Sequence, residues 1–267
     1  MDGDRVIAAD VFVDGFAHLQ AGERPIQMLR SGPVRFVRWG PEGRRGTGFT
    51  EEFFPVDLDA AAVLAHIRAA KPGPRHYVTM IGGEADDPAG VFAAAGYAVN
   101  SRESLMALDL VNSDVAPAFR GRLSIDPITS VTFAHPVTSV TPVDAERSHA
   151  LQLAQTGRVR LITPAQLADP AVVVLQVAAD GEPACTGKVA LVGGHAFVSD
   201  IATLPAYRRR GVARSLMLGL HVAARDAGAK TTVLASSDMG RALYLGLGYR
   251  IVREIVLWEQ ANPPPSA

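Results

Sequence analysis

The sequence predicts an α+β fold, a mixed three-layer arrangement in which helices flank a central sheet. Strand-like and helix-like segments are mixed along the whole chain. Tight turns at Asp180-Gly181 and Gly193-Gly194 join three strand-like runs before the helical segment that begins near Val212. A doubly wound parallel sheet would instead alternate strand and helix strictly, so that architecture is not expected.

Apolar spacing and turn residues define the expected elements of the first half. Helices are expected where apolar residues recur every three or four positions, and strands where apolar residues alternate or run together. In order, these are a helix at 6–19, strands at 28–39 and 48–56, a helix at 57–70, a strand at 76–81, a short helix at 87–96 and a strand at 104–110. Prolines and a glycine interrupt residues 112–136, which we expect to be a crossover or linker.

The second half is expected to contain five strands and three helices. In order, its elements are a helix at 144–155, strands at 171–179, 188–192 and 196–203, a helix at 212–227, a strand at 231–235, a helix at 240–247 and a strand at 249–258. The tail at 262–265 is Asn-Pro-Pro-Pro, which is typical of a disordered end.

Composition excludes several classes of function. A chain of 267 residues with 48% apolar residues suggests two domains or one large one. The net charge of −1 argues against a protein built to bind nucleic acid, which needs an excess of Lys and Arg. No apolar run is long enough for a membrane span, and the start of the chain is unlike a signal peptide, so a cytoplasmic protein is expected. The single cysteine, Cys185, and scattered histidines predict neither a disulfide nor a metal site.

The segment 200–213 is the most informative for chemistry. A strand ends at Thr203, Pro205 breaks it, three arginines follow, and a helix begins at Gly211. The free N–H groups of a helix N-terminus bind anions, and neighbouring arginines add positive charge. The segment therefore predicts a phosphate site, and the alternative is an ordinary turn whose charges are solvated. The Walker and dinucleotide-binding glycine patterns are both missing.

Two motifs in this half resemble those of the GNAT N-acetyltransferase superfamily. Arg208-Arg209-Arg210-Gly211-Val212-Ala213 matches the signature [QR]xxGx[GA], and Leu243 to Tyr249 is similar to the family's helical tyrosine followed by Gly-aromatic. The resemblance covers about 142–258. It implies a twisted, mostly antiparallel sheet flanked by helices, and acetyl-CoA as the co-substrate, without a metal.

The resemblance also implies roles for particular residues. Tyr244 would protonate the departing CoA thiolate, and Asp200 would be the base that takes the proton of the attacking amine. The backbone of residues 201–203, at the end of the expected strand, would pair with the pantetheine arm of CoA. The backbone amides of residues 209–214 would hold its pyrophosphate. The implied cofactor-binding residues are Ile201, Ala202, Thr203, Arg208, Arg209, Arg210, Gly211, Val212, Ala213, Arg214, Ser215 and Ser237.

Alternatives stay open for several of these residues. Tyr244 could be a packing residue, Asp200 could pair with one of the arginines, and Ser215 could be a surface residue. His195 and Ser199 are further candidates for the base. Ser237 departs from the asparagine that the family often has at this position, which leaves the adenosine side of the cofactor less defined. Cys185 is expected to be a buried or strand-edge thiol, with a nucleophile as the alternative.

The first half echoes the second. Val91 to Tyr97 followed by 104–110 resembles Leu243 to Tyr249 followed by 255–258, but no phosphate loop precedes it at the needed place. The sequence therefore predicts a degenerate GNAT-like domain at 1–122 and a catalytic one at 123–267. The alternative is an unrelated α+β cap. The first half would complete the acceptor site or mediate a homodimer.

The expected activity is transfer of an acetyl group from acetyl-CoA to a primary amine of a small molecule or peptide, by direct attack in a ternary complex. Two other functions are compatible with the same motifs. One is a non-catalytic acyl-CoA-binding regulatory module, and the other is a protein-interaction module whose GNAT folds are relics. The sequence alone does not name the acceptor, because fold does not determine function.

Overall fold

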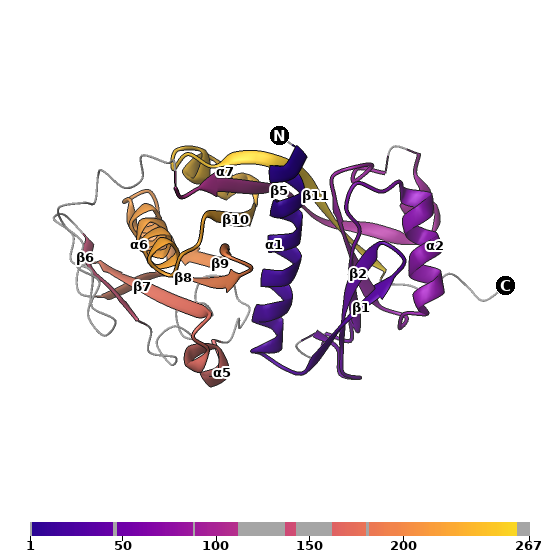
Figure 1. Ribbon diagram of the computed structural model, residues 1–267, viewed down its shortest axis with the longest axis horizontal. Coiled ribbons are helices and arrows are strands. Elements are labelled where there is room, and N and C mark those ends of the chain that lie inside the picture. The colour runs from indigo at the N-terminus through magenta and orange to yellow at the C-terminus, as the bar shows by residue number, and fades with distance from the viewer. Residues whose placement is uncertain are drawn as a thin grey trace.

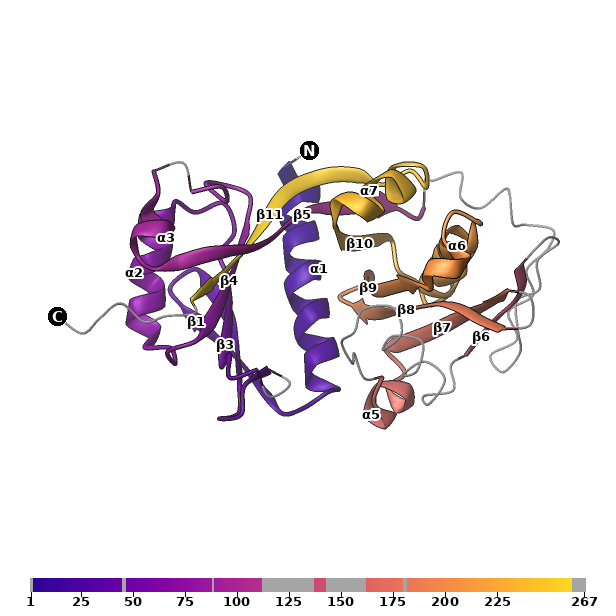
Figure 2. The same ribbon diagram turned by 180° about the vertical axis from the view of Figure 1, so that it is seen from behind.

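The computed structural model of the 267-residue chain describes residues 2–44, 47–87, 89–111, 137–142, 162–179 and 182–260. Two groups of elements lie to either side of the long helix α1, and one sheet connects them (Figures 1 and 2). The elements are α1 (Asp2–Ala21), β1 (Ile26–Ser31), β2 (Val34–Trp39), β3 (Glu51–Phe54), α2 (Ala60–Ala70), β4 (His76–Ile81), α3 (Val91–Ala94), β5 (Tyr97–Asp109), β6 (Val137–Pro142), α5 (Pro164–Ala168), β7 (Val172–Ala179), β8 (Glu182–Val192), β9 (His195–Thr203), η2 (Pro205–Tyr207), α6 (Val212–Asp226), β10 (Thr231–Ser236), α7 (Asp238–Leu245) and β11 (Arg250–Gln260).

The described strands form one 11-stranded sheet in the order β1-β2-β3-β4-β11-β5-β10-β9-β8-β7-β6. Neighbours are antiparallel except for two parallel pairs, β3 with β4 and β9 with β10. This confirms the predicted α+β class with a mostly antiparallel sheet flanked by helices.

The same order of elements occurs twice along the chain. The first copy is β1-β2-β3-α2-β4-α3-β5, and the second is β7-β8-β9-α6-β10-α7-β11. Each copy begins with an antiparallel hairpin and contains one parallel pair whose strands are joined through a helix. The echo between Val91–Tyr97 and Leu243–Tyr249 therefore falls at equivalent places, because each segment contains a short helix that leads into a long strand.

The last strand of each copy lies between the two copies. β11 pairs with β4 of the first copy along its whole second half, from Ile255 opposite Ile81 to Gln260 opposite His76. β5 pairs with β10 of the second copy, from Thr231 opposite Asp109 to Ser236 opposite Ser104. The two long strands also pair with each other, so the hydrogen-bonded sheet is continuous from one copy to the other.

Two helices cover opposite faces of the second copy's strands. α1 packs against β8, β9 and β10, with Phe12 in edge contact with Phe197 of β9 at 5.4 Å between ring centroids. α6 packs against β7, β8 and β9 and buries Leu216 and Leu220 in a separate apolar cluster. Gly187 of β8 makes the α6 packing possible, because a Cβ there would collide with Ile201 and touch Leu216. Strand β9 is therefore held from both faces, and α1 of the N-terminal segment is one of the two supports.

Most expected elements of the described part are confirmed, with several differences, among them the unexpected strand β6 and a β8 that is longer than the expected strand at 188–192. The run 28–39 is a hairpin, because Gly32, at φ 57°, turns the chain between β1 and β2. β5 begins at Tyr97 and is longer than the expected strand at 104–110. Helix α5 was not anticipated, and its N-terminus is capped by Thr163, whose hydroxyl oxygen accepts from the N–H of Gln166 and whose own N–H donates to the side-chain oxygen of Gln166. The expected linker at 112–136, the helix at 144–155, the turn residues Asp180-Gly181 and the tail at 262–265 lie outside the described residues.

Within the described residues, no helix combines the length and the apolar character needed to cross a bilayer.

Candidate functional site

Strands β9 and β10 separate where the sequence places the acyl-donor site. They are paired only at Ala196 opposite Thr232 and Phe197 opposite Val233. Beyond this point β9 follows β8, to Thr203 opposite Cys185, while β10 follows β5. In the described part of the chain, the edge of β9 from Val198 to Thr203 has no ladder partner on the β10 side. An open strand edge can pair with the amides of an extended ligand.

A β-bulge shapes β9 at this open edge. Thr186 is opposite Ala202 and Lys188 is opposite Ser199, so Gly187 alone faces both Asp200 and Ile201. Asp200 has φ 56°, a left-handed conformation that non-glycine residues adopt rarely, with Asn and Asp the most tolerant. Bulges of this kind redirect side chains and are frequent beside active sites.

The loop after β9 leads directly to the N-terminus of α6. Gly211 is the N-cap of α6 at φ 83°, and Arg209 is also left-handed at φ 61°. A Cβ at 211 would meet no atom within 4 Å, and the cap makes no side-chain hydrogen bond. The first N–H groups of a helix have no partner within the helix. The end of α6 is therefore an exposed set of backbone donors that a glycine leaves accessible.

The arginines of the loop make contacts with different parts of the structure. Nε of Arg208 donates to the carbonyl of Thr203 at 3.3 Å, and the guanidinium of Arg210 lies over the ring of Tyr207 at 5.2 Å. Arg209 is exposed, and Arg214, in the first turn of α6, donates to the carbonyl of Gly246 at 3.0 Å. These contacts hold the loop between the end of β9 and the end of α7 and keep positive charge beside the end of α6.

Tyr244 lies in the core on α7, next to the opening between β9 and β10. Its side chain is 8% exposed and its ring packs in edge contact with Tyr249 at 5.7 Å. Burial raises the pKa of the Tyr244 phenol well above its usual range, and the nearby Cys185 and Glu103 add to the effect. The phenol therefore keeps its proton at neutral pH, as a proton donor must.

Cys185 lies on β8 opposite Thr203, the last residue of the open edge. The thiol is fully buried and is 3.1 Å from the Oγ1 of Thr203. Burial raises the pKa of the Cys185 thiol to about 12, so it remains a neutral thiol at physiological pH. The prediction of a buried thiol is confirmed, and a thiolate nucleophile at neutral pH is disfavoured.

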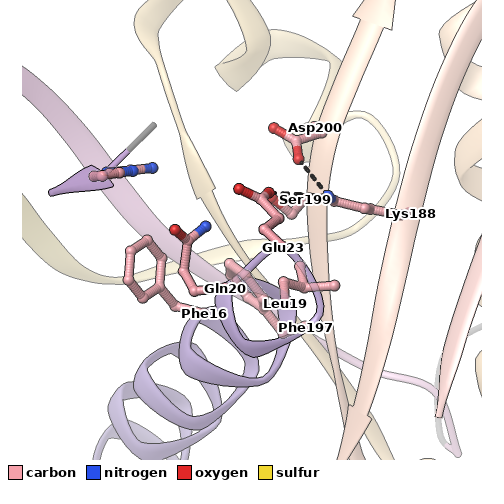
Figure 3. Close-up of a pocket in the computed structure, with 9 residues that line it drawn as sticks. Phe16, Leu19, Gln20, Glu23, Lys188, Phe197, Ser199 and Asp200 are labelled. Carbon is pink, nitrogen blue, oxygen red and sulfur yellow. Dashed lines mark ion pairs between the residues drawn. The ribbon is translucent and has the colours of Figure 1, made fainter. Parts of the chain in front are cut away.

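Asp200 forms an ion pair with a lysine of the neighbouring strand. Its Oδ2 lies 3.0 Å from Nζ of Lys188 on β8, and the same Nζ lies 3.9 Å from Glu23, just beyond the end of α1 (Figure 3). Lys188 is 2% exposed, and the two carboxylates are nearly as buried. Desolvating charges is costly unless they are paired, so the three groups stabilise one another.

The remaining predicted residues lie along the same path, with one exception. Ile201, Ala202 and Thr203 are half-buried on β9, Val212, Ala213 and Ser215 are in the first turn of α6, and Ser237 is exposed just after β10. Ser199 lines a small pocket together with Asp200. His195 begins β9 at the paired end, away from the opening. Sequence reasoning did not single out Lys188, Glu23 or Gln20, although a lysine inside the apolar run of β8 is a signal of a buried ion pair.

The equivalent place in the first copy is closed. β3 and β4 remain paired, and the pairing continues through the bridge from Val56 to Ile81. The N-terminus of α2 is occupied by carboxylates of the chain itself. Asp59 accepts from the N–H of Ala62 at 2.8 Å, and Glu84 accepts from the N–H of Ala60 at 3.3 Å. An anion would meet two negative charges at this helix end.

Among the described residues, no group of three or more His, Cys, Asp or Glu side chains is arranged to hold a metal ion.

Comparisons with known proteins agree with this geometry. Residues 171–251, which include β9, the loop, α6 and α7, match the family described as "Acetyltransferase (GNAT) domain". The chain is similar to the structure of a GCN5-related N-acetyltransferase from Kribbella flavida, with 22% identity, 97% of this chain and 96% of that chain covered, and a TM-score of 0.61. A search of curated proteins found no significant match.

Two further solved structures are similar over most of the chain. A GCN5-related N-acetyltransferase from Sphaerobacter thermophilus has 14% identity and a TM-score of 0.51, with 88% of this chain and 82% of that chain covered. A tandem GNAT protein from the clavulanic acid biosynthesis pathway has 15% identity and a TM-score of 0.50, with 100% and 97% covered. At these identities the structural likeness establishes the fold.

The family match defines the class of protein. The chain contains a GNAT acetyltransferase domain at 171–251, and this class comprises acetyl-CoA-dependent acyltransferases.

Proposed function

We propose that the protein is an N-acetyltransferase that transfers an acetyl group from acetyl-CoA to a primary amine of a small molecule or peptide, by direct attack in a ternary complex. The observation that carries the proposal is the separation of β9 from β10 beyond Phe197 and Val233, directly before the loop that opens α6. An open strand edge for an amide-containing arm and a helix end for phosphates occur in the order that acetyl-CoA requires.

The residues of the opening fit such a donor. The edge from Ile201 to Thr203 offers backbone donors and acceptors to the pantetheine amides. Gly211 leaves the end of α6 uncovered, and a side chain there would project into the space that the phosphates need. Arg208 to Arg210 supply positive charge, with Ser215 and Ser237 as further polar contacts. Acetyl-CoA supplies a thioester, which is an acetyl group already activated for transfer.

Two side chains would carry out the proton transfers of the reaction. The amine nitrogen forms a bond to the acetyl carbon as the bond from that carbon to sulfur breaks. Tyr244 holds a proton on its phenol oxygen that it gives to the departing sulfur, and its raised pKa keeps that proton in place beforehand. Asp200, on the bulge of β9, receives the proton of the amine directly or through a water.

A single copy of the fold would carry the activity. We infer that the chain is a tandem of two GNAT-like units, consistent with the repeated element order and with the likeness to a tandem GNAT protein. The first unit would not bind acetyl-CoA, because β3 and β4 stay together and Asp59 and Glu84 cap α2. The first unit would support the second one structurally, in part through helix α1, which packs on β9.

Thermal melting with acetyl-CoA tests the proposal most directly, with free CoA and NAD as comparisons. A ligand at 100 times its dissociation constant stabilises a fold by about 2.7 kcal/mol, which shifts the melting temperature by a few degrees for a chain of this size. The expected result is a shift with acetyl-CoA and CoA but none with NAD. Absence of a shift at saturating acetyl-CoA would contradict the proposal. A shift without acetylation of any amine would indicate a regulatory acyl-CoA sensor.

A further inference from the structure

The β-bulge in β9 separates two stretches of different register. Lys188 of β8 stands opposite Ser199, and Thr186 stands opposite Ala202, so β9 has one residue more than β8 between these two pairs. In an antiparallel ladder, the N–H and C=O groups of successive residues point alternately to one neighbouring strand and to the other. One extra residue reverses this alternation beyond the bulge. The bulge therefore determines which N–H and C=O groups of residues 201–203 face the open side of β9.

The bulge depends on an unfavourable backbone conformation at Asp200. This residue is one of the two that face Gly187, and its φ of 56° lies in the left-handed region. A non-glycine residue stays in that region only where the surrounding structure maintains it. An extended conformation, which is the ordinary one in a strand, would relieve the strain and change the register beyond it. The register of the open edge therefore depends on the contacts that hold Asp200 in place.

The side chain of Lys188 provides such a contact (Figure 3). Its Nζ lies 3.0 Å from Oδ2 of Asp200 across the two neighbouring strands. The side chain of Lys188 is 2% exposed and that of Asp200 is 9% exposed. Water and salt screen a buried ion pair much less than an exposed one. The pair therefore holds the Asp200 side chain toward β8 and, with it, the left-handed backbone of the bulge.

Lys188 is itself held by elements on both sides. Its cross-strand partner on β7, away from β9, is Val174, which is buried in the apolar cluster that includes residues of α1. Nζ of Lys188 also lies 3.9 Å from Oε1 of Glu23, just beyond the end of α1. Lys188 thus connects the N-terminal segment with the open edge of β9.

We propose that Lys188 is a positioning residue for the acyl donor. Through its ion pair with Asp200 it maintains the bulge, and the bulge puts residues 201–203 in the register that pairs with the pantetheine arm. This inference rests on the proposed acetyltransferase function. Lys188 lies on the face of the sheet that α1 covers, as its cross-strand partner Val174 does, whereas α6, whose N-terminus would bind the phosphates, covers the other face. Lys188 therefore acts on the pantetheine part of the donor and not on its phosphate part.

The test compares two ligands by calorimetry on the full-length protein. Acetyl-CoA carries both the pantetheine arm and the phosphates, whereas adenosine 3′-phosphate 5′-diphosphate carries the phosphates without the arm. Lys188→Met removes the ammonium group and keeps an unbranched apolar side chain in its place. It should weaken acetyl-CoA binding at least tenfold and leave the dissociation constant of the nucleotide within twofold of wild type. Unchanged acetyl-CoA affinity would overturn the inference, and so would an equal loss for both ligands, because that would indicate general damage to the fold.

A second substitution tests whether Lys188 acts through residue 200. Glycine adopts a positive φ without strain, so it needs no side-chain contact to keep the bulge. Lys188→Met combined with Asp200→Gly should therefore bind acetyl-CoA within about threefold of wild type, although Lys188→Met alone does not. A double variant that binds as weakly as Lys188→Met would show that the lysine does not act through the backbone of the bulge.

Val174→Ala is the matched control for stability. Val174 is buried beside Lys188 on the strand that lies away from β9, so the loss of two methyl groups there weakens the core without contact with the bulge. Both dissociation constants should stay within twofold of wild type, and a selective loss of acetyl-CoA affinity in this control would contradict the inference. If wild type itself does not bind acetyl-CoA, the proposed function fails and this inference fails with it. If wild type binds acetyl-CoA and Lys188→Met shows no selective loss, only the role of Lys188 is overturned.

Discussion

Nζ of Lys188 lies 3.0 Å from the carboxylate of Asp200, and the two residues stand on neighbouring strands next to a β-bulge. The pair fixes the carboxylate at the open edge of β9, although Asp200 has the left-handed φ of 56°. A strained, buried, charged residue of this kind is typical of functional sites, where strain is maintained by the surrounding structure.

Replacement of Asp200 separates its chemical role from its backbone role. Asp200→Asn keeps a side chain that tolerates a left-handed conformation, whereas Asp200→Ala does not. Both should lower kcat by about 10²-fold or more if the carboxylate is the base. The alanine variant should be less stable than the asparagine variant by about 1 kcal/mol, because the left-handed backbone is strained for alanine. Denaturant unfolding checks the difference, and undiminished turnover in Asp200→Asn would exclude Asp200 as the base.

Gly211→Glu should abolish acetyl-CoA binding. The substitution puts bulk and negative charge at the end of α6, where φ is 83° and a Cβ would face open space. Gly193→Glu is the matched control, because Gly193 is also left-handed, at φ 56°, with open space around it, but lies in the turn between β8 and β9. Calorimetry should show wild-type affinity in the control. Retained affinity in Gly211→Glu would remove the phosphate-loop assignment.

Tyr244→Phe should lower kcat about 10²-fold and leave the affinity for acetyl-CoA within a few fold. The change removes the phenol proton and preserves the ring that packs against Tyr249. Steady-state kinetics and calorimetry on the same preparation measure the two effects separately. Full activity in the variant would mean that another group or a water protonates the leaving thiolate.

The full chain should bind one acetyl-CoA rather than two. The second copy has an open β9 edge, whereas in the first copy β3 stays bonded to β4 and Asp59 and Glu84 occupy the N-terminus of α2. Calorimetric titration of the wild-type chain gives the stoichiometry. Two sites per chain would contradict the view that the first copy is degenerate.

Stability should fall as the pH is lowered from about 6.5 to about 4, because His221 is buried without charge. Burial lowers the pKa of His221 from 6.5 to about 4, and its Nε2 is bonded to the hydroxyl of Tyr249 at 2.8 Å. Between these pH values the histidine is protonated in the unfolded chain but stays neutral in the folded chain. The free energy of unfolding therefore falls by about 3 kcal/mol by the acid end of this range. Denaturant unfolding at several pH values checks this, and His221→Gln should flatten the dependence. An equally steep dependence in the variant would assign it to other groups.

The sequence was most informative where local rules decide the structure. The apolar run from Val172 to Ala179, the amphipathic pattern of Val212 to Asp226 and the glycine at 211 each depend on neighbours along the chain, and each predicted its element. The hairpin at Gly32 was missed because both of its strands carry apolar residues and the turn is short. The only local sign of the turn between β1 and β2 is the dipeptide Gly32-Pro33.

Contacts between residues that are far apart in the sequence could not be predicted from local patterns. The pairing of β11 with β4 and of β5 with β10 depends on which edges remain free after folding. The ion pair between Lys188 and Glu23 joins residues from opposite halves of the chain. Tyr244 and Asp200 could be singled out as candidates from a motif, but the residues that surround Asp200 could not, because α1 reaches this place only through the tertiary fold.

The exchange of β5 and β11 has a consequence for how the protein is made. β11 ends at Gln260 and is the partner that completes β4, whose residues leave the ribosome far earlier. During synthesis the edge of β4 therefore stays without this partner until β11 has been translated. A premature stop before residue 250 would remove β11 and leave the sheet incomplete in both halves.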